Sequence, residues 1–269
     1  MHRIQLPTPD GHLSVVDEGS GSNVVFVHGT PSSSFEFRHV VASLKSRHRC
    51  VAPDHLGFGA SDKPADGDYS VAAHQRRFAL AMEALAVEDA VFVLHDFGSA
   101  IALPWMFENP DKVSGVVLAN TFLWPTRGPM RWVLAFYASA LGRWIYRATN
   151  LSVGLLLPWA WGSHKALTDE LHASYKAPFA NANERYATSA LPGELLGGAL
   201  AQLEPRGREL RRWPVRAVWG MADPLVGASE LERWRALLPD LKVDEVERAG
   251  HFIADEAPDV VSRAVLALV

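Results

Sequence analysis

An aspartate stands where the sequence predicts that a buried strand turns sharply into a helix. The segment His95–Gly98 follows the apolar run Ala90–Leu94 and precedes a helical pattern that begins at Ser99. Such a turn lifts one side chain into a cleft, where it can act as a nucleophile. A carboxylate that attacks an sp³ carbon forms an alkyl ester that water cleaves, whereas attack on an acyl group gives an anhydride. Asp96 at this turn therefore favours cleavage of carbon–halogen or strained carbon–oxygen bonds.

A structural interpretation of Asp96 competes with the chemical one. Asp is favoured at the N-cap of a helix because its side-chain oxygen accepts hydrogen bonds from unpaired backbone N–H groups. A catalytic carboxylate instead needs a base that activates water, an acid that orients the base, and donors for developing negative charge. The chain offers a candidate for each of these partners, which favours the catalytic interpretation.

His251 is the candidate base. It lies between the last expected strand and a C-terminal helix, and Gly250 before it permits a tight loop that presents the imidazole. A lone histidine is more often a surface residue or a hydrogen-bonded core residue. The order of nucleophile, acid and histidine along the chain matches that of hydrolases with a nucleophile at a strand–helix turn.

Asp223 is the candidate acid. It follows an expected strand over residues 215–219, and it would hold one tautomer of His251 and stabilise the imidazolium form. An Asp before a proline is also a common turn pair. The other strand that could supply an acid, over residues 113–119, is followed by Asn120 and no carboxylate, which favours Asp223.

The segment His28–Pro31 follows the first buried strand and is the candidate donor loop. Gly29 lets the backbone approach a substrate closely, and the backbone N–H of Thr30 can point at the turn that holds Asp96. A simple strand-ending turn is the alternative. The backbone N–H of Phe97 is a second candidate donor at the same place.

Length and composition indicate one large α/β domain with an insertion. Of 269 residues, 48% are apolar, and the net charge of −4 combines both signs without a basic block that would bind nucleic acid. The single cysteine, Cys50, and an N-terminus without an apolar signal segment predict a cytoplasmic protein. The apolar stretch Leu151–Trp161 is too short to span a bilayer, so we expect it to line a site or a domain interface and expect no membrane partner.

No metal or cofactor is predicted. The histidines are scattered, and no His/Cys cluster has the spacing of a metal site. The glycine-rich segment 54–64 lacks the Gly-Lys-Ser/Thr ending of a phosphate-binding loop, so a structural loop is the better interpretation. The predicted partners are a small apolar organic substrate and water.

Short apolar strands alternate with helical patterns along most of the chain, starting with a hairpin at Asp10-Gly11. This alternation predicts a mostly parallel sheet with helices on both faces. Between about residues 122 and 213 the pattern is helical and rich in aromatic residues, without a convincing strand. We predict a core of residues 1–121 and 214–269 and a helical cap of residues 122–213 over the carboxyl ends of the strands, where ligands bind in open α/β sheets.

The chain resembles the haloalkane dehalogenases of the α/β-hydrolase superfamily over nearly its whole length. The resemblance rests on the Asp96 turn, on Asp223 and His251, and on three further stretches, which are His28–Ser34 with Arg38, Asp54–Pro64, and Tyr175–Phe179. The turn and Gly250-His251 are shared with epoxide hydrolases, whereas Ser61–Pro64 and Tyr175–Phe179 are closer to dehalogenases. The resemblance implies an α/β-hydrolase fold with an inserted cap and hydrolysis of a carbon–halogen bond through an ester on Asp96.

The chain departs from the dehalogenase pattern at both halide donors. Dehalogenases usually carry Trp after the nucleophile, where this chain has Phe97, and Asn or Glu where it has Thr30. Phe97 has no side-chain donor, and a Thr hydroxyl reaches less far than an amide. An indole of the cap is a candidate substitute, from Trp124, Trp132, Trp159 or Trp161. The substrate pocket is predicted to include Trp124, Trp159, Phe179 and Phe252.

Other functions stay open at this point. An epoxide hydrolase would need an acid for the opening oxygen, for which the cap offers Tyr137, Tyr146, Tyr175 and Tyr186. Enzymes that cleave β-lactones and luciferase-like oxygenases share the same turn. A non-catalytic receptor for small molecules is disfavoured because all three triad positions are intact.

Overall fold

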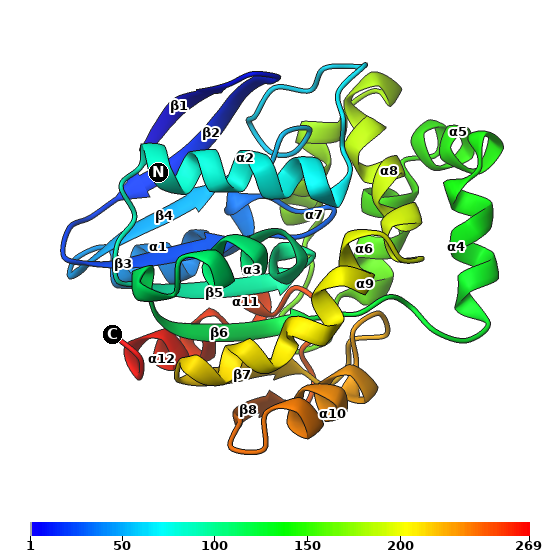
Figure 1. The fold of residues 1–269 in the computed structure, drawn as a ribbon. Coiled ribbons are helices and arrows are strands. Elements are labelled where there is room, and N and C mark those ends of the chain that lie inside the picture. Colours follow the sequence, from blue (N-terminus) through cyan, green and yellow to red (C-terminus); the bar gives the residue numbers. More distant parts are fainter. Residues whose placement is uncertain (1) are drawn as a thin grey trace.

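Eight strands form one mixed sheet through the middle of the molecule (Figure 1). The computed structural model describes residues 2–269. The strand order is β1-β2-β4-β3-β5-β6-β7-β8, in which β1–β2 and β2–β4 pair antiparallel and all other pairs are parallel. The strands are β1 (Arg3–Thr8), β2 (Gly11–Glu18), β3 (Ser22–Val27), β4 (His48–Pro53), β5 (Ala90–Asp96), β6 (Val113–Thr121), β7 (Val215–Gly220) and β8 (Lys242–Val246).

The central strands are buried on both faces, because their side chains alternate between two separate hydrophobic clusters. On β5, Val91 and Val93 point to one cluster, and Phe92 and Leu94 point to the other. This is why these strands are continuously apolar in sequence rather than alternating. Helices α1 (Arg38–Leu44), α11 (Ile253–Glu256) and α12 (Pro258–Leu266) cover the first face, and α2 (Val71–Ala84) and α3 (Gly98–Glu108) cover the second.

The mostly parallel sheet predicted from the strand–helix alternation and the α/β-hydrolase fold implied by the family resemblance are both confirmed. Apolar residues at helical spacing over residues 35–46 predict one helix, but the structure has a 3₁₀ turn (Ser34–Phe37) followed by α1. The closing helix predicted over residues 257–269 is α12, and the short α11 before it was not predicted. Pro258 explains why α11 and α12 are separate, because proline is favoured in the first turn of a helix and has no N–H to continue the preceding one.

The segment between β6 and β7 is helical and contains no strand among its described residues. Figure 1 shows its helices beyond the end of the sheet where β5 and β6 finish. The last of them, α9, lies beside α3 on the face of the sheet, so this part of the segment packs against the core. The helices are α4 (Met130–Ala138), α5 (Ala140–Ala148), α6 (Leu157–Ala160), α7 (Asp169–Lys176), α8 (Tyr186–Glu194) and α9 (Ala199–Leu203).

No helix within residues 2–269 is long and apolar enough to cross a bilayer. No group of three or more His, Cys, Asp or Glu side chains in the same range is arranged to hold a metal ion. Cys50 is buried in β4, and burial raises the pKa of its thiol to about 12, as expected for an unreactive core cysteine.

Candidate active site

Asp96 occupies the turn between β5 and α3 with a left-handed backbone conformation, at φ +50°. The turn fits only because its neighbours are small. A Cβ on Gly98 would lie 2.2 Å from the carbonyl oxygen of Val27, and one on Gly29 would lie 2.3 Å from Cβ of Asp96. Strained backbone of this kind recurs at functional turns. The N-cap interpretation of Asp96 is wrong, because Phe97 is the N-cap residue of α3 and no side chain caps it.

The carboxylate of Asp96 faces backbone donors and a histidine. Its Oδ2 accepts a hydrogen bond from the backbone N–H of Thr30 at 2.8 Å, and Oδ1 lies 3.8 Å from Nε2 of His251. Burial raises the pKa of Asp96, although His251, His95 and the backbone N–H groups of Thr30 and Phe97 oppose this effect. These groups stabilise a charged carboxylate in a nearly dry position, where a weakly solvated anion is an effective nucleophile.

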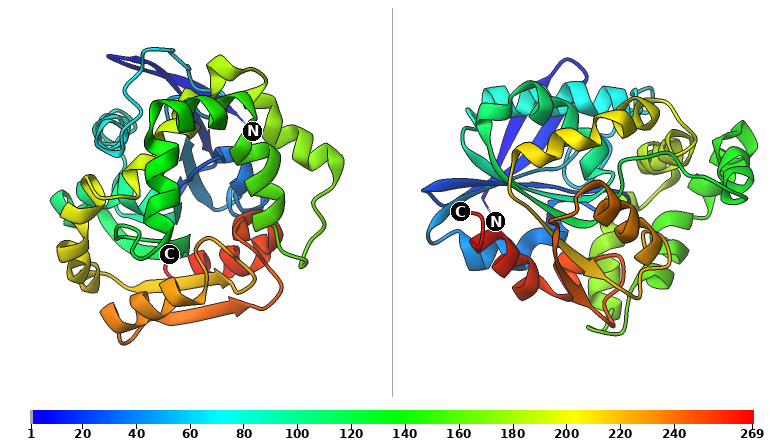
Figure 2. Two further views of the ribbon diagram at one scale, coloured as in Figure 1. Left: turned by 90° about the vertical axis from the view of Figure 1, so that its right-hand side faces the viewer. Right: turned by 60° about the horizontal axis from the view of Figure 1, so that its bottom comes forward.

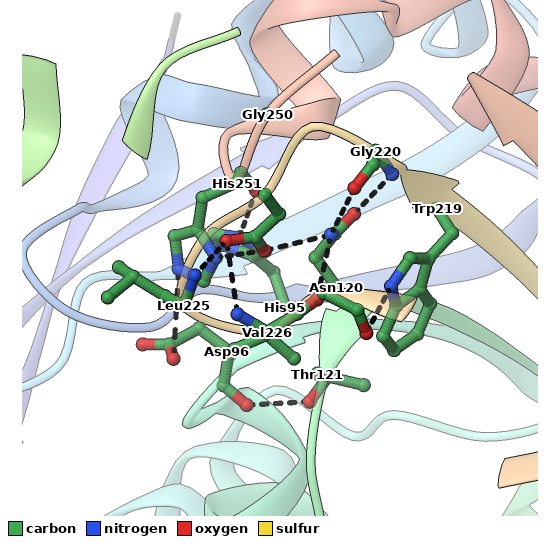
Figure 3. A network of polar contacts seen from close by, with 12 residues as sticks. His95, Asp96, Asn120, Thr121, Trp219, Gly220, Leu225, Val226, Gly250 and His251 are labelled. Atoms are coloured by element: carbon green, nitrogen blue, oxygen red, sulfur yellow. Dashed lines mark hydrogen bonds and ion pairs between the residues drawn. The ribbon is translucent and has the colours of Figure 1, made fainter. Parts of the chain in front are cut away.

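His251 lies between Asp96 and Asp223, and Figure 3 shows it above Asp96. Its Nδ1 lies 2.8 Å from Oδ2 of Asp223, which leaves Nε2 directed toward Asp96 at 3.8 Å. Burial alone would lower the pKa of His251, but the charges of Asp223, Asp96 and Glu36 raise it to about 9. The structure therefore brings the three residues proposed from the sequence together, with a hydrogen bond between His251 and Asp223 and a longer ionic contact between His251 and Asp96.

Asp223 is held in place by four hydrogen bonds. Its Oδ1 accepts the backbone N–H groups of Leu225 at 2.7 Å and Val226 at 3.0 Å, and its Oδ2 contacts His251 and Nδ2 of Asn120. Burial raises the pKa of Asp223, but His251 and these backbone donors outweigh it and the pKa is lowered overall. A fixed anion at this position selects the His251 tautomer that has its lone pair on Nε2.

Asn120 is a site residue for which the sequence predicted no role. It lies near the carboxyl end of β6 at φ +36°, and its Nδ2 lies 2.9 Å from Oδ2 of Asp223. Its Oδ1 accepts the backbone N–H of Gly220 at 2.7 Å, so one amide ties the ends of β6 and β7 together (Figure 3). The signal in the sequence was its position at the carboxyl end of a buried strand, which was considered only as a place for an acid.

Comparison with known proteins gives the family. A family model described as the alpha/beta hydrolase fold matches residues 23–258. The chain is 31% identical over 262 residues to haloalkane dehalogenase 2 of Mycobacterium tuberculosis, with 95% of this chain and 91% of the relative covered. The chain belongs to the haloalkane dehalogenase-like α/β hydrolases.

One solved structure and one further relative by sequence are also similar to this dehalogenase-like hydrolase over most of its length. The crystal structure of haloalkane dehalogenase DatA from Agrobacterium tumefaciens superposes with a TM-score of 0.87 at 26% identity, covering 99% of this chain and 95% of that one. A cis-3-alkyl-4-alkyloxetan-2-one decarboxylase of Shewanella oneidensis is 29% identical over 270 residues, covering 93% of this chain and 82% of the relative. Relatives with two different reactions thus share nearly the whole chain.

The two positions at which this hydrolase departs from the dehalogenase pattern both lie beside Asp96. The ring of Phe97 is buried edge-on against Phe122, with 5.1 Å between the ring centroids. The hydroxyl of Thr30 is buried and has no hydrogen-bond partner among the described residues. Thr30 therefore keeps a side-chain donor free next to the nucleophile, and Phe97 offers only its backbone N–H.

None of the four candidate indoles offers a buried, unoccupied N–H. Trp124 donates its N–H to Glu230 and packs against Trp234 at 4.9 Å between ring centroids. Trp161 donates to the carbonyl of Lys165 at 2.7 Å. The other two are largely exposed, Trp132 by 82% and Trp159 by 55%. Within residues 2–269 no hydrogen bond or ring contact joins Trp124 or Trp159 to Asp96 or His251, so their place in the substrate pocket stays a prediction.

The predicted pocket residues Phe179 and Phe252 are both buried near the cap–core boundary. Phe252 lies beside His251 and stacks on Trp161, with 5.5 Å between ring centroids. Phe179 faces Phe58 at 6.0 Å and lines a cavity of about 210 Å³ that also contacts Pro31, next to the donor loop. These contacts place aromatic side chains next to His251 and the donor loop.

Tyr146 is a candidate tyrosine buried on α5. Burial raises the pKa of its hydroxyl, the negative charge of Asp96 adds to this effect, and the side chain of Ser152 opposes it. Tyr175 donates its hydroxyl to Asp255 at 2.9 Å, and Tyr186 lies under the guanidinium of Arg147. The role of a cap tyrosine as an acid stays a prediction, with Tyr146 as the candidate whose hydroxyl senses the charge of Asp96.

Proposed function

We propose that this chain hydrolyses small apolar haloalkanes through a covalent alkyl ester on Asp96. The observation that carries the proposal is the arrangement of its carboxylate, with Oδ2 held by the N–H of Thr30 and Oδ1 open toward His251. An aspartate at this turn suits attack on an sp³ carbon. Nearly full-length similarity to haloalkane dehalogenases supports the same reaction class.

In the first step, Oδ1 of Asp96 attacks the carbon that bears the halogen. The carbon–oxygen bond forms as the carbon–halogen bond breaks, and the electron pair of that bond leaves with the halide. The carboxylate becomes a neutral ester, and its negative charge passes to the halide and leaves the site with it. A buried, fixed nucleophile contributes through orientation and incomplete solvation.

In the second step, His251 removes a proton from a water that attacks the ester carbonyl carbon. The oxyanion that forms on Asp96 is stabilised by the backbone N–H groups of Thr30 and Phe97. Its collapse expels the alcohol, which takes a proton from the imidazolium, and the regenerated carboxylic acid releases the second proton. Asp223 and Asn120 keep Nε2 of His251 on the reacting side.

Ester formation itself prepares His251 to act as a base. In the free protein the charges of Asp223, Asp96 and Glu36 hold the pKa of His251 at about 9, against the effect of burial. When Asp96 becomes an ester, its charge no longer supports the imidazolium, so the pKa of His251 falls toward neutral pH. His251 thus becomes able to accept a proton at the step in which water attacks the ester.

Cleavage of a strained carbon–oxygen bond is the second candidate function. The leaving oxygen of an epoxide or a β-lactone needs a proton or a hydrogen bond, and the free hydroxyl of Thr30 and the buried hydroxyl of Tyr146 are suited to provide one. An indole N–H would stabilise a departing halide better, and Phe97 does not offer one. The oxetan-2-one decarboxylase relative favours keeping this alternative.

The experiment is mass spectrometry of a His251→Ala variant after incubation with 1-bromobutane, 1,2-epoxyhexane or a cis-3,4-dialkyl-oxetan-2-one. His251→Ala should trap the ester, because alkylation does not need the base. His164→Ala, which changes an exposed histidine, is the matched control and should turn over without trapping. We expect a butyl adduct on Asp96 from the bromide, whereas a hydroxyalkyl adduct from the epoxide alone would assign the second function.

Isotope labelling tests the covalent step independently. Over many turnovers in H₂¹⁸O the label should enter the carboxylate of Asp96, since water attacks the ester carbonyl rather than the alkyl carbon. Direct attack of water on the substrate would place the label only in the alcohol, even in a single turnover. That result, with no adduct in the His251→Ala variant, would contradict the covalent mechanism.

A further inference from the structure

The two helices α4 and α5 carry half of the large apolar residues that are exposed within residues 2–269. Of the twelve large apolar residues that are exposed within residues 2–269, eight lie between Met130 and Trp159. Six of them lie on α4 and α5, and we call these six the α4–α5 patch: Met130, Trp132, Val133, Phe136, Leu141 and Trp144.

The patch is not a by-product of a loosely placed helix, because each helix has one packed side and one apolar side that faces outward. On α4, Ala138 lies against Gly193 of α8, whereas Trp132 and Phe136, four residues apart, share the opposite side. On α5, Tyr146 is buried, whereas Leu141 and Trp144, three apart, are each about 60% exposed.

The patch also stands away from the sheet. In Figure 1 α4 and α5 lie at the right-hand edge, outside α8, and in the left view of Figure 2 they face the reader. None of the nine residues of α4 is buried. Soluble monomers rarely expose a continuous apolar area of this kind unless it is a binding surface.

Within the stretch of chain that forms the patch, the charged side chains have one sign. Residues 112–168 contain no Asp or Glu, whereas four arginines fall within residues 122–160. Arg131 and Arg143 are exposed, and neither forms an ion pair with any described residue. The whole chain has a net charge of −4, so this cationic and aromatic surface is local.

From this combination we infer that the α4–α5 patch binds the surface of an anionic phospholipid bilayer. Exposed indole and phenyl rings enter the boundary between headgroups and acyl chains, and arginines beside them bind lipid phosphates. No spanning segment is required, so the inference departs from the expectation of no membrane partner, which rested on the shortness of the apolar stretch Leu151–Trp161. The inference does not depend on the reaction catalysed.

A second copy of the chain fits the patch less well. A twofold contact would place the same surface on both sides of the interface and bring Arg131 and Arg143 of the two copies together without an acidic residue between them. The apolar area would favour such a dimer, but the unpaired guanidinium groups would oppose it. An anionic lipid surface satisfies both features.

The test is co-sedimentation with vesicles of phosphatidylcholine, with and without about one third phosphatidylglycerol, in the absence of any substrate. The wild-type chain should bind the mixed vesicles, should bind pure phosphatidylcholine far more weakly, and should be released by high salt. Tryptophan fluorescence should shift to shorter wavelength on binding, because exposed indoles leave water.

Two variants separate the apolar and the charged contributions. Trp132→Ser with Phe136→Ser should lower binding at least tenfold on mixed vesicles. Arg143→Glu should lower it roughly thirtyfold, since one cation is removed and one anion is added near the surface. The matched control is Arg263→Glu with Leu266→Ser on α12, which makes the same kinds of change on an exposed helix far from the cap and should leave binding unchanged.

Thermal unfolding of each variant reports whether the fold is retained, so loss of binding by an unfolded variant is not counted as support. No binding of the folded wild type to mixed vesicles would overturn the inference, and so would equal binding by wild type and folded patch variants. Concentration-dependent dimerisation that disappears in Trp132→Ser with Phe136→Ser, without vesicle binding, would show instead that the patch is a subunit interface.

Discussion

Glu36 and His95 form a buried pair directly behind the nucleophile. Oε1 of Glu36 lies 3.0 Å from Nδ1 of His95, and each side chain is 1% exposed. Nε2 of His95 lies 2.8 Å from the carbonyl oxygen of His251. A carbonyl oxygen can only accept a hydrogen bond, so Nε2 of His95 carries a proton. A second proton lies between Oε1 of Glu36 and Nδ1 of His95. The pair thus connects the turn before Asp96 to the loop of the base.

Two substitutions at Glu36 should show how much its hydrogen bond to His95, as distinct from its charge, contributes to the free energy of unfolding. Glu36→Gln keeps a partner for Nδ1 of His95, so its free energy of unfolding should stay near that of the wild type. Glu36→Leu leaves Nδ1 of a buried imidazole unpaired and should cost about 1–3 kcal/mol, measured by urea unfolding. Equal stability of the two variants would mean that the contact contributes nothing.

Asn120 should matter for both its amide and its backbone. Asn120→Ala removes the bonds to Asp223 and Gly220 and places Ala at φ +36°, so we expect a loss of stability of about 2–4 kcal/mol and slower ester hydrolysis. Asn120→Gly removes the same hydrogen bonds, but glycine adopts the positive φ at this position without strain. The difference between Ala and Gly in urea unfolding should therefore be about 1 kcal/mol, and the absence of any difference would exclude backbone strain at this position.

The pH dependence of hydrolysis should differ from the titration of the free protein. His251 should titrate by NMR at about 9 in the free chain, where Asp223, Asp96 and Glu36 raise its pKa against burial. Hydrolysis of the ester that the wild type forms in a single turnover requires neutral His251 and should increase with pH through a midpoint below that value, because the charge of Asp96 is then absent. Coincident midpoints would show that Asp96 is not esterified in the slow step.

The same titration predicts how stability depends on pH. The pKa of His251 is higher in the folded chain, at about 9, than in the unfolded chain, at about 6.5. Its stabilising contribution is complete below the unfolded value and is lost as the pH rises from about 6.5 through 9. The free energy of unfolding should fall over this range in the wild type and should fall less in His251→Gln, which has no group to titrate.

Thr30 should show opposite effects on stability and on rate. Thr30→Val replaces a buried, unpaired hydroxyl with a methyl group of the same shape, so the chain should gain about 1 kcal/mol in thermal or urea unfolding. Release of the leaving group in single-turnover assays should slow. The control is Thr188→Val, because the hydroxyl of Thr188 donates to the carbonyl of Arg185 at 3.0 Å and its removal should destabilise the chain. A Thr30→Val variant with unchanged leaving-group release would exclude this hydroxyl as a donor.

Phe97→Trp should add the missing halide donor. An indole N–H aimed at the leaving halide is worth about 3 kcal/mol in the transition state, or roughly a hundredfold in chloride release. Because the ring of Phe97 is packed edge-on against Phe122, the larger indole should be tested with and without Phe122→Leu. Phe97→Leu serves as a control that changes the packing without adding a donor. Chloride released by the wild type as fast as bromide would reveal a donor elsewhere.

Much of this protein follows from short stretches of sequence. The strand–helix alternation predicted a mostly parallel sheet with helices on both faces, which is confirmed, because strands buried on both faces are continuously apolar and stand out between helical periods. Asp96, Asp223 and His251 follow from the same local pattern, since each lies at the end of a strand and such ends meet at one edge of a parallel sheet. The structure brings them together, with His251 hydrogen-bonded to Asp223 and 3.8 Å from Asp96, and their roles stay predictions.

Contacts between distant segments were decided only by the tertiary structure. Asn120 and Asp223 are 103 residues apart, and nothing near either residue in sequence indicates that one amide joins β6, β7 and the acid. Which cap side chains face Asp96 depends on how α4–α8 pack, since rotation of a helix by one residue turns a side chain by about 100°. That packing ties up the indoles of Trp124 and Trp161, buries Tyr146 near the nucleophile and leaves Trp132 in water.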